Sequence, residues 1–373
     1  MTETLKRLMD ETTDEVGFTP PDLDRIVSSG DRTLRRRRGF LVAGGLAAAV
    51  TAGVLAGVGL PGGDDRGVDV ATGGATAPIS WISDGVLHEG DTEIALGHMA
   101  VAYVRNAVGS VFVADDAEIY AVVGDQVERI GTTRLGRAEE QLLLLADPSG
   151  TRVAWIDPGR GGRFVSHDLS TGQQTAFGTE SGADGLFAAD GDTFYVEDDG
   201  VATGFDLAAG TSVPVEDLLL DRADILGAGG GLLATTVDGD PSDGDGGGIR
   251  VSVPGEEGVV IPDVWSDSVR FSPDAAHVAT DADEMQVFDA RSGERIALDM
   301  GTRPFASVYE WLDDDTVAAI ASPPGAQDPE EAAQLITCEL ATGECVVAVD
   351  DLGSFAEILD DDFLLPIGST IGG

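Results

Sequence analysis

The 373-residue chain contains two cysteines, and their spacing predicts one specific reaction, the formation of a disulfide bond. Cys338 and Cys345 lie in the segment ITCELATGECVVA, on either side of a Leu-Ala-Thr-Gly turn. Opposite residues on the two strands of such a hairpin are about 4.5–5.5 Å apart at Cα, which suits a disulfide bond. Two thiolates without a nearby histidine leave a metal site incomplete. We predict a disulfide in an oxidising compartment, with free thiols as the alternative.

The four histidines, His88, His98, His167 and His277, do not form a metal-binding pattern. His167 and His277 fall in apolar segments expected to be strands, where a half-buried histidine is more often structural than catalytic. The sequence contains no His-x-x-x-His, Glu-x-x-His or Cys-x-x-Cys spacing, no Gly-x-Ser-x-Gly elbow, no P-loop and no dinucleotide fingerprint. We therefore predict no catalytic, cofactor-binding or metal-binding residues, and no cofactor.

The aspartate-rich segment DGDPSDGDGGG (238–248) suggests calcium binding by its composition. Its spacing departs from the EF-hand rule of ligands at alternate positions, then a glycine, then a glutamate at position twelve. We interpret it as a loop between two strands. Loose, nonspecific binding of calcium or magnesium by the acidic surface is the alternative.

The net charge of −45 results from 67 acidic residues against 22 basic ones. Nucleic-acid binding is excluded as an interpretation, because neutralising phosphates requires clustered Lys or Arg. Residues 1–38 hold eight acidic and eight basic residues, so the excess negative charge lies entirely beyond them. This excess indicates a strongly solvated surface, with a specific cation-binding role as the alternative.

An apolar segment near the N-terminus predicts a membrane span. Gly39 to Leu60 provides 22 uncharged residues, about 33 Å of helix, against a hydrocarbon core of about 30 Å. Four arginines (35–38) precede it and two aspartates (64–65) follow. The positive-inside rule places the N-terminus in the cytoplasm and the larger part outside. We expect a cytoplasmic tail (1–38), a transmembrane helix (39–60), a linker (61–78) and an extracytoplasmic domain (79–373).

Export by a twin-arginine signal, followed by cleavage, is the alternative to this single-pass anchor. The segment RRGFL (37–41) fits such a signal. The best cleavage site, Val54-Leu55-Ala56, is weak and lies inside the apolar run. The tail is too short to fold stably alone and is either a passive tether or a binding segment for a cytoplasmic partner.

Beyond the linker, short apolar runs alternate with Gly- and Asp-rich turns and predict an all-β domain. The clearest turns are DLSTG (168–172), DLAAG (206–210), DARSG (289–293) and ELATG (339–343), with weaker copies ending at glycines 90, 124 and 255. These seven glycines recur about every 42 residues, which is the length of one four-stranded propeller blade. We predict a β-propeller with seven blades, and with six if one turn is misassigned.

A second motif, an acidic turn followed by an apolar strand, precedes most of these turns. It occurs in DPSGTRVAW (147–155), AADGDTFYV (188–196), SPDAAHVAT (272–280), LDDDTVAAI (312–320) and LDDDFLLPI (359–367). Together with the Asp-Leu-x-Thr-Gly turns, these segments resemble the blades of WD-repeat and TolB-like propellers. The whole layout resembles uncharacterised actinobacterial membrane-anchored propellers of this kind. No blade combines the Gly-His and Trp-Asp pairs of the eukaryotic repeats.

The two ends of the domain are each too short for a full blade. We expect FLLPI (363–367) to pair near ISWIS (79–83), because closing the ring through its ends removes an exposed sheet edge.

The resemblance specifies architecture and leaves function open. The leading hypothesis is a binding, sensing or scaffold module without a catalytic site, which holds a protein, peptide or glycan on its rim loops. The alternatives are a propeller hydrolase with carboxylate-bound metal in the central channel, and a transmembrane regulator of a cytoplasmic partner. The oligomeric state is not predicted.

Overall fold

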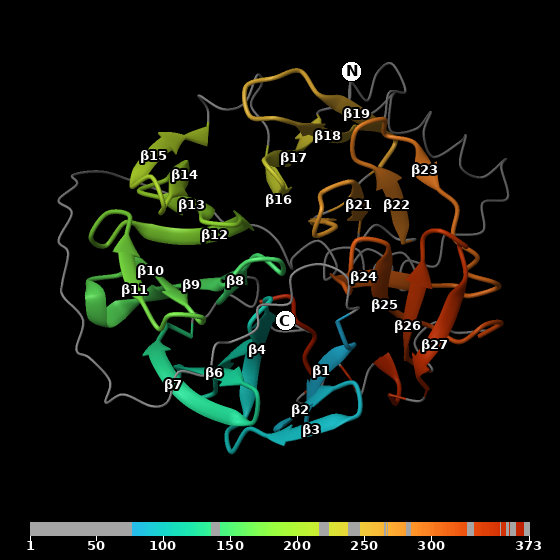
Figure 1. Ribbon diagram of the computed structural model, residues 1–373, viewed down its shortest axis with the longest axis horizontal. Helices are drawn as coiled ribbons and strands as arrows, with labels where there is room; N and C mark the ends of the chain where they lie inside the picture. Colours follow the sequence, from blue (N-terminus) through green and yellow to red (C-terminus); the bar gives the residue numbers. More distant parts are fainter. Residues whose placement is uncertain are drawn as a thin grey trace, which may run out of the picture. The chain divides into compact units, whose positions relative to one another are not determined.

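The computed structural model describes residues 77–135, 142–215, 224–237, 247–264, 266, 268–280, 285–326, 332–350, 352–355, 358 and 363–368. Within these ranges the chain forms seven antiparallel sheets around a common axis, so the domain is an all-β propeller with seven blades (Figure 1). The six-bladed alternative is wrong. The predicted tail, the predicted transmembrane helix and residues 61–76 of the linker lie outside the described residues. Among the described residues, no helix is long and apolar enough to span a membrane.

Six blades contain four strands each, with the first strand of each nearest the axis. Blades one to three comprise Ala100–Arg105 (β4), Ser110–Ala114 (β5), Glu118–Val123 (β6) and Gln126–Thr132 (β7); Leu145–Ala146 (β8), Arg152–Asp157 (β9), Arg163–Asp168 (β10) and Gln174–Phe177 (β11); and Ala183–Asp190 (β12), Thr193–Asp198 (β13), Val201–Asp206 (β14) and Thr211–Pro214 (β15). A 3-10 turn, Pro158–Arg160 (η1), follows β9.

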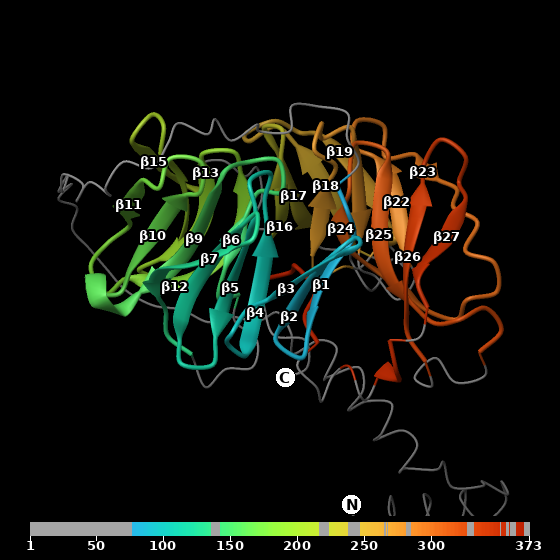
Figure 2. The same ribbon diagram turned by 60° about the horizontal axis from the view of Figure 1, so that its bottom comes forward.

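Blades four to six comprise Ile225–Gly229 (β16), Leu232–Val237 (β17), Gly248–Ser252 (β18) and Val259–Pro262 (β19); Val269–Phe271 (β20), His277–Thr280 (β21), Gln286–Asp289 (β22) and Arg295–Ile296 (β23); and Ala306–Trp311 (β24), Thr316–Ala321 (β25), Gln334–Glu339 (β26) and Cys345–Val349 (β27). The closing blade contains Ser80–Ser83 (β1), Val86–Glu89 (β2) and Thr92–Ala95 (β3). Figure 2 shows these strands running between the two faces of the ring.

The glycine turns join the third and fourth strands of each four-stranded blade, and β2 to β3 in the closing blade, as the period predicts. All seven glycines have positive φ, for example +70° at Gly172 and +72° at Gly293, where a residue with a Cβ would be strained. The aspartate that begins the turn stabilises it: one carboxylate oxygen of Asp289 accepts hydrogen bonds from the backbone N–H groups of Arg291 and Ser292. Sequence and turn geometry therefore agree at each blade.

Four of the acidic turns, those that follow β8, β12, β20 and β24, join the first and second strands of a blade, and some also link neighbouring blades. The Asp147 carboxylate accepts a hydrogen bond from the backbone of Ser149 in its own turn and another from the backbone of Gly191 in blade three, at 2.6 Å. Asp190 of blade three in turn accepts hydrogen bonds from the backbone of Gly230 and Gly231 in blade four. These carboxylates explain why an acidic residue precedes the apolar strand.

The ring closes through its two ends, which confirms the predicted pairing. Ile82 of β1 and Leu364 exchange both backbone hydrogen bonds, each at 2.9 Å. The C-terminal segment thus lies on the inner side of β1, toward the centre of the ring (Figure 1). Gly368 continues the closure, because its backbone N–H donates to Tyr103 of β4 and its carbonyl accepts from Leu143.

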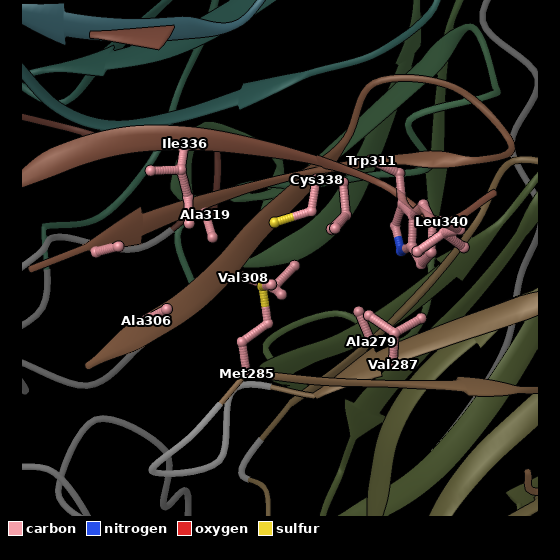
Figure 3. Packing of buried hydrophobic residues seen from close by; sticks show 12 residues of the cluster. Ala279, Met285, Val287, Ala306, Val308, Trp311, Ala319, Ile336, Cys338 and Leu340 are labelled. Atoms are coloured by element: carbon pink, nitrogen blue, oxygen red, sulfur yellow. The ribbon is translucent and has the colours of Figure 1, made fainter. Parts of the chain in front are cut away.

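The core lies between the blades, where side chains from adjacent sheets meet. Figure 3 shows one such contact, in which Met285 and Val287 of blade five face Val308 and Ile336 of blade six. Each blade alternates residues toward its two neighbours, because successive side chains of a strand point to opposite faces. The innermost strands therefore face the axis mainly with their backbone edges and with a few long side chains.

Candidate functional site

A cavity of about 140 Å³ lies on the axis of the ring. Its wall takes residues from the innermost strands of all six four-stranded blades, and Pro366 and Ile367 of the C-terminal segment complete it. In Figure 1 these strands surround the centre of the ring. Residues from six blades and from the C-terminal segment meet at this cavity, so it is the candidate for a binding site.

Two glycines of β16 allow the innermost strands to approach closely at this wall. A Cβ on Gly227 would lie 2.1 Å from the carbonyl oxygen of Val269, and one on Gly229 would lie 2.5 Å from the Cβ of Phe271. Any larger residue at either position would push β16 and β20 apart. These glycines therefore set the width of the cavity between blades four and five.

The wall has a polar sector and an apolar sector. The polar sector comprises Arg105 from β4, Arg270 from β20, and Tyr309 and Glu310 from β24. The other polar residues of the wall are Asp147, Ser149, Ser268 and Ser272. The apolar sector includes Leu142, Leu144, Phe187 and Leu226. The arrangement suits a small ligand with a charged end and a short apolar body.

Arg105 and Glu310 form a buried ion pair in the polar sector. Nε of Arg105 lies 3.5 Å from a carboxylate oxygen of Glu310, and the two side chains are 11% and 7% exposed. Arg105 also donates to the hydroxyl of Ser80 at 3.1 Å and to the carbonyl of Pro78. The Ser80 hydroxyl receives a further hydrogen bond from Tyr103, at 2.7 Å. This closure network, Ser80, Tyr103, Arg105 and Glu310, joins blade six, the closing blade and blade one.

Burial controls the protonation of this sector. It raises the pKa of Glu310 to about 7, against the opposing attraction of Arg105 and Arg270. Burial also raises the pKa of Tyr103 and Tyr309 well above the ordinary value for tyrosine, and the Glu310 charge acts in the same direction. Near neutral pH both tyrosines are protonated and can donate hydrogen bonds. With a pKa of about 7, Glu310 is present in both its protonated and its ionised form.

Tyr309 of the cavity wall has a buried hydroxyl group whose hydrogen bonding is incomplete within the described part of the chain. Its side chain is buried, with 2% of the residue exposed, and its hydroxyl has no hydrogen-bond partner among the described residues. Buried hydroxyl groups are normally satisfied, so an unpaired one in a cavity wall indicates a position where a ligand or water is bound.

The predicted disulfide is present but lies away from the cavity. Cys338 and Cys345 are bonded, with 2.08 Å between the sulfur atoms and 4.1 Å between the Cα atoms. The Cα distance is shorter than the expected 4.5–5.5 Å. The two cysteines lie next to the hydrogen-bonded pair Glu339 and Glu344 and occupy a non-hydrogen-bonded position, the closer of the two kinds of antiparallel pair. The bridge fastens the two outer strands of blade six.

The two histidines expected in strands lie there. His167 is buried in β10, 6.4 Å from Trp155 between ring centres, and burial lowers its pKa. His277 begins β21 and lies near Trp311, 6.2 Å between ring centres. Neither lines the axial cavity. The aspartate-rich segment connects β17 to β18, as predicted, but residues 238–246 lie outside the described residues.

Across the described ranges, no group of three or more His, Cys, Asp or Glu side chains has an arrangement that would hold a metal ion. The carboxylate that lines the cavity in the polar sector, Glu310, is engaged with an arginine.

Sequence analysis missed the closure network. Its members are far apart in the chain: Ser80 and Glu310 are separated by 230 residues. One signal was available, because Arg105 and Glu310 are charged residues at the ends of otherwise apolar strands, AVAYVR and ASVYEW. A charge in a strand expected to be buried needs a partner or a function.

The chain is similar in fold to several solved structures of propellers. No protein-family model and no curated protein matches the chain. Similar solved structures include a chain of the mitotic checkpoint complex, with a TM-score of 0.46 at 12% identity, covering 81% of this chain and 90% of that one. The WD40 repeats of RRP9 give 0.43 at 14% identity, covering 74% and 84%. A putative TolB from Agrobacterium tumefaciens gives 0.36 at 12% identity, covering 76% and 91%.

Proposed function

We propose that the chain is a binding module whose ligands engage the axis and rim of the propeller, and that its N-terminal segment anchors it in the membrane with the propeller outside the cytoplasm. The observation that carries the binding proposal is the polar wall of the axial cavity, where Arg105, Tyr309 and Glu310 are buried together. Burying such groups opposes folding unless they are paired or used, so their presence at a cavity supports a function there.

The anchoring proposal is supported by the sequence pattern alone. The uncharged run from Gly39 to Leu60, the preceding arginines and the weak cleavage site favour an uncleaved single span. The disulfide of blade six is consistent with an oxidising compartment outside the membrane.

Cell fractionation tests the anchor. A C-terminally tagged full-length chain is expected in the membrane fraction at full size, and its tag is expected to be digested by protease added to intact spheroplasts. A shortened tagged product in the soluble exported fraction would instead identify a twin-arginine signal with cleavage.

Comparative capture tests the binding function. The tagged full-length chain is cross-linked in its own membrane and purified beside a control that retains residues 1–78 and lacks the propeller. A protein, peptide or glycan that requires the propeller is expected with the full-length chain only. Identical recovery from both baits would contradict a binding role for the propeller and favour a role for the tail alone.

The hydrolase alternative predicts a different result. A carboxylate-bound divalent metal in the channel would raise the melting temperature of the full-length chain on addition of the metal, and a chelator would lower it. Under the binding proposal, melting is insensitive to a chelator.

A further inference from the structure

We propose that Asp84 is a site of spontaneous covalent modification, at which the backbone between Asp84 and Gly85 isomerises to isoaspartate and weakens the closing blade, independently of the proposed function. Two turns of the chain support this proposal. They share one sequence and one geometry, but only one of them holds its aspartate side chain.

The two turns are Asp84-Gly85, between β1 and β2, and Asp199-Gly200, between β13 and β14. Each is a two-residue loop between directly paired strand residues. The backbone angle φ is +51° at Asp84 and +54° at Asp199, and it is +70° and +71° at the following glycines. Asp-Gly is a preferred sequence for such turns, because both positions need positive φ. Neither residue type nor φ therefore distinguishes the two sites.

Hydrogen bonds hold the aspartate of the second turn. The hydroxyl of Thr179 donates to a carboxylate oxygen of Asp199, at 2.6 Å. The backbone N–H of Asp199 donates to the carbonyl of Gly182, at 2.7 Å. A hydrogen bond to an ionised carboxylate is short and strong, so it fixes the orientation of the side chain. The carboxyl carbon of Asp199 is thereby restrained from turning toward the nitrogen of Gly200.

The side chain of Asp84 lacks such a restraint. The residue is exposed, and its carboxylate forms no hydrogen bond or ion pair with another described residue. Gly85 has no Cβ that would shield its backbone nitrogen. A carboxyl group that rotates beside an unshielded nitrogen of the same chain reaches the geometry for ring closure without a bimolecular encounter.

The reaction needs only the chain and water. The nitrogen of Gly85 attacks the carboxyl carbon of Asp84 in its protonated form, and a carbon–nitrogen bond forms. One carboxyl oxygen leaves as water, with the proton of the acid group and the proton of the amide. Water then adds to either carbonyl group of the resulting cyclic succinimide. One addition restores aspartate and the other gives isoaspartate, so the mass of the chain is unchanged and no oxidant or reductant takes part.

Isoaspartate at this position would act on the closure of the ring. It leads the backbone through the side-chain carboxyl carbon and adds a methylene group to a turn whose length sets the pairing of β1 with β2. The carbonyl of Gly85 also accepts a hydrogen bond from the backbone of Leu96, at 2.9 Å. Ile82, two residues before Asp84, pairs with Leu364 in the blade that closes the ring (Figure 1).

Peptide mapping of the aged chain tests the proposal. The full-length chain, extracted in detergent, is incubated at neutral pH either folded or unfolded in urea. Mass-spectrometric fragmentation that distinguishes the two backbones then measures isoaspartate at each site. In the folded chain, isoaspartate should form at residue 84 about tenfold or more faster than at residue 199, because only the second site must first break a hydrogen bond to a charged group. In urea the two rates should be similar, because the sequences of the turns are the same.

Two kinds of variant separate the restraint from its consequence. Thr179→Val removes the hydroxyl that holds Asp199, so it should raise the rate at residue 199 and leave the rate at residue 84 unchanged. Asp84→Gly blocks succinimide formation and tolerates positive φ, so its melting temperature should not change with age. The aged wild type should melt about 2 °C or more lower than fresh protein. The matched control, Asp199→Gly, should lose as much on ageing as the wild type.

Three results would overturn the proposal. They are equal rates at the two sites in the folded chain, a lower rate at residue 84 than at residue 199, and isoaspartate at residue 84 in urea only. If Thr179→Val does not fold, the comparison of folded and unfolded wild type still decides. Isoaspartate at residue 84 without any fall in melting temperature would contradict the effect on the closing blade.

Discussion

The contact between blades two and three differs in kind from the junction that closes the ring. Blades two and three meet through an aromatic cluster, in which Phe177 lies 5.3 Å from Phe164, 5.8 Å from Phe194 and 5.2 Å from Phe205 between ring centres. The closing junction also buries apolar residues, but at its inner end it places the hydrogen-bonded closure network, with a charged pair at its centre.

The chain connectivity explains this difference. Blades two and three follow each other directly, with five residues between the end of β11 at Phe177 and the start of β12 at Ala183, so the connection itself limits how they meet. The closing blade combines the two ends of the domain, and no connection fixes their register. Apolar packing is non-directional, whereas hydrogen bonds and ion pairs act only in a defined geometry. We infer that the closure network specifies the register that the chain does not impose.

Removing the C-terminal strand should have the largest effect. Deletion of residues 363–373 removes the backbone pairing with Ile82 and the burial of Phe363, Leu364 and Leu365. At about 1.5–3 kcal/mol for each buried side chain, we expect a loss of roughly 5 kcal/mol or more in the free energy of unfolding. Urea unfolding of the detergent-extracted chain measures it. Deletion of residues 369–373 alone is the control, and equal stability of the long deletion and the wild type would contradict closure through the ends.

Matched single substitutions at the two junctions should cause similar losses in the free energy of unfolding. Only the loss at the closing junction should be restored by a second substitution. Arg105→Met leaves Glu310 buried beside one arginine fewer, and Phe177→Ala opens a cavity in the aromatic cluster. Each should lower the free energy of unfolding by about 3–5 kcal/mol. Replacing Glu310 by Leu in the Arg105→Met background should restore much of the loss, because no unpaired charge is then buried.

The double-mutant result decides what the polar junction contributes. If Arg105→Met with Glu310→Leu regains stability but melts over a broader range, the network serves to specify the register. If the double variant remains as unstable as Arg105→Met, the network itself stabilises the ring and the contrast between the two junctions disappears.

The pH dependence of stability should be concentrated at the closing junction. Burial raises the pKa of Glu310 from 4.5 to about 7, so the folded state binds a proton that the unfolded state releases between these values. Stability from this group is therefore complete below about pH 4.5 and is lost as the pH rises through about 7. The groups that act on it are Ser80, Glu89, Tyr103, Arg105 and Arg270.

Unfolding of wild type and Glu310→Gln at several pH values measures this effect. The wild type should lose roughly 3 kcal/mol relative to the variant between pH 4.5 and 8, an order-of-magnitude figure at 1.4 kcal/mol for each pKa unit. Comparison with the variant removes the common effect of the many surface carboxylates. A constant difference between the two proteins across this range would show that Glu310 keeps its ordinary pKa.

The sequence predicts the blades because their turns are local. A glycine such as Gly172 needs positive φ, and the aspartate at the start of its turn satisfies the nearby backbone, so both residues report the turn without knowledge of the rest of the chain. The period of the turns then gives seven blades. The pairing of Ile82 with Leu364 was also predictable, because each end lacks the strands of a full blade.

The axial cavity was not predictable in the same way. Its wall depends on how far seven separate strands stand from the axis, and that distance follows from packing between blades. Gly227 illustrates the limit, since its need for close approach to Val269 comes from another blade and leaves no local pattern. Arg105 and Glu310 are visible as charges in apolar strands, but their pairing arises only when the ring closes.

The disulfide extends the comparison from the axis to the outer edge of blade six, where the smallest effect is expected. It closes a short loop, for which the chain-entropy relation gives roughly 2–3 kcal/mol, because reduction lets the unfolded chain explore more conformations. Reductant should lower the melting temperature of the wild type by several degrees. The reductant should leave unchanged the melting temperature of a Cys338→Ala, Cys345→Ala double variant, whose cysteine-free hairpin retains the turn at Gly343.

Mass spectrometry after alkylation without reduction should find both cysteines unmodified in the membrane-extracted chain. Alkylation of both cysteines would show that they are free thiols. The disulfide would then no longer support an oxidising location for the propeller.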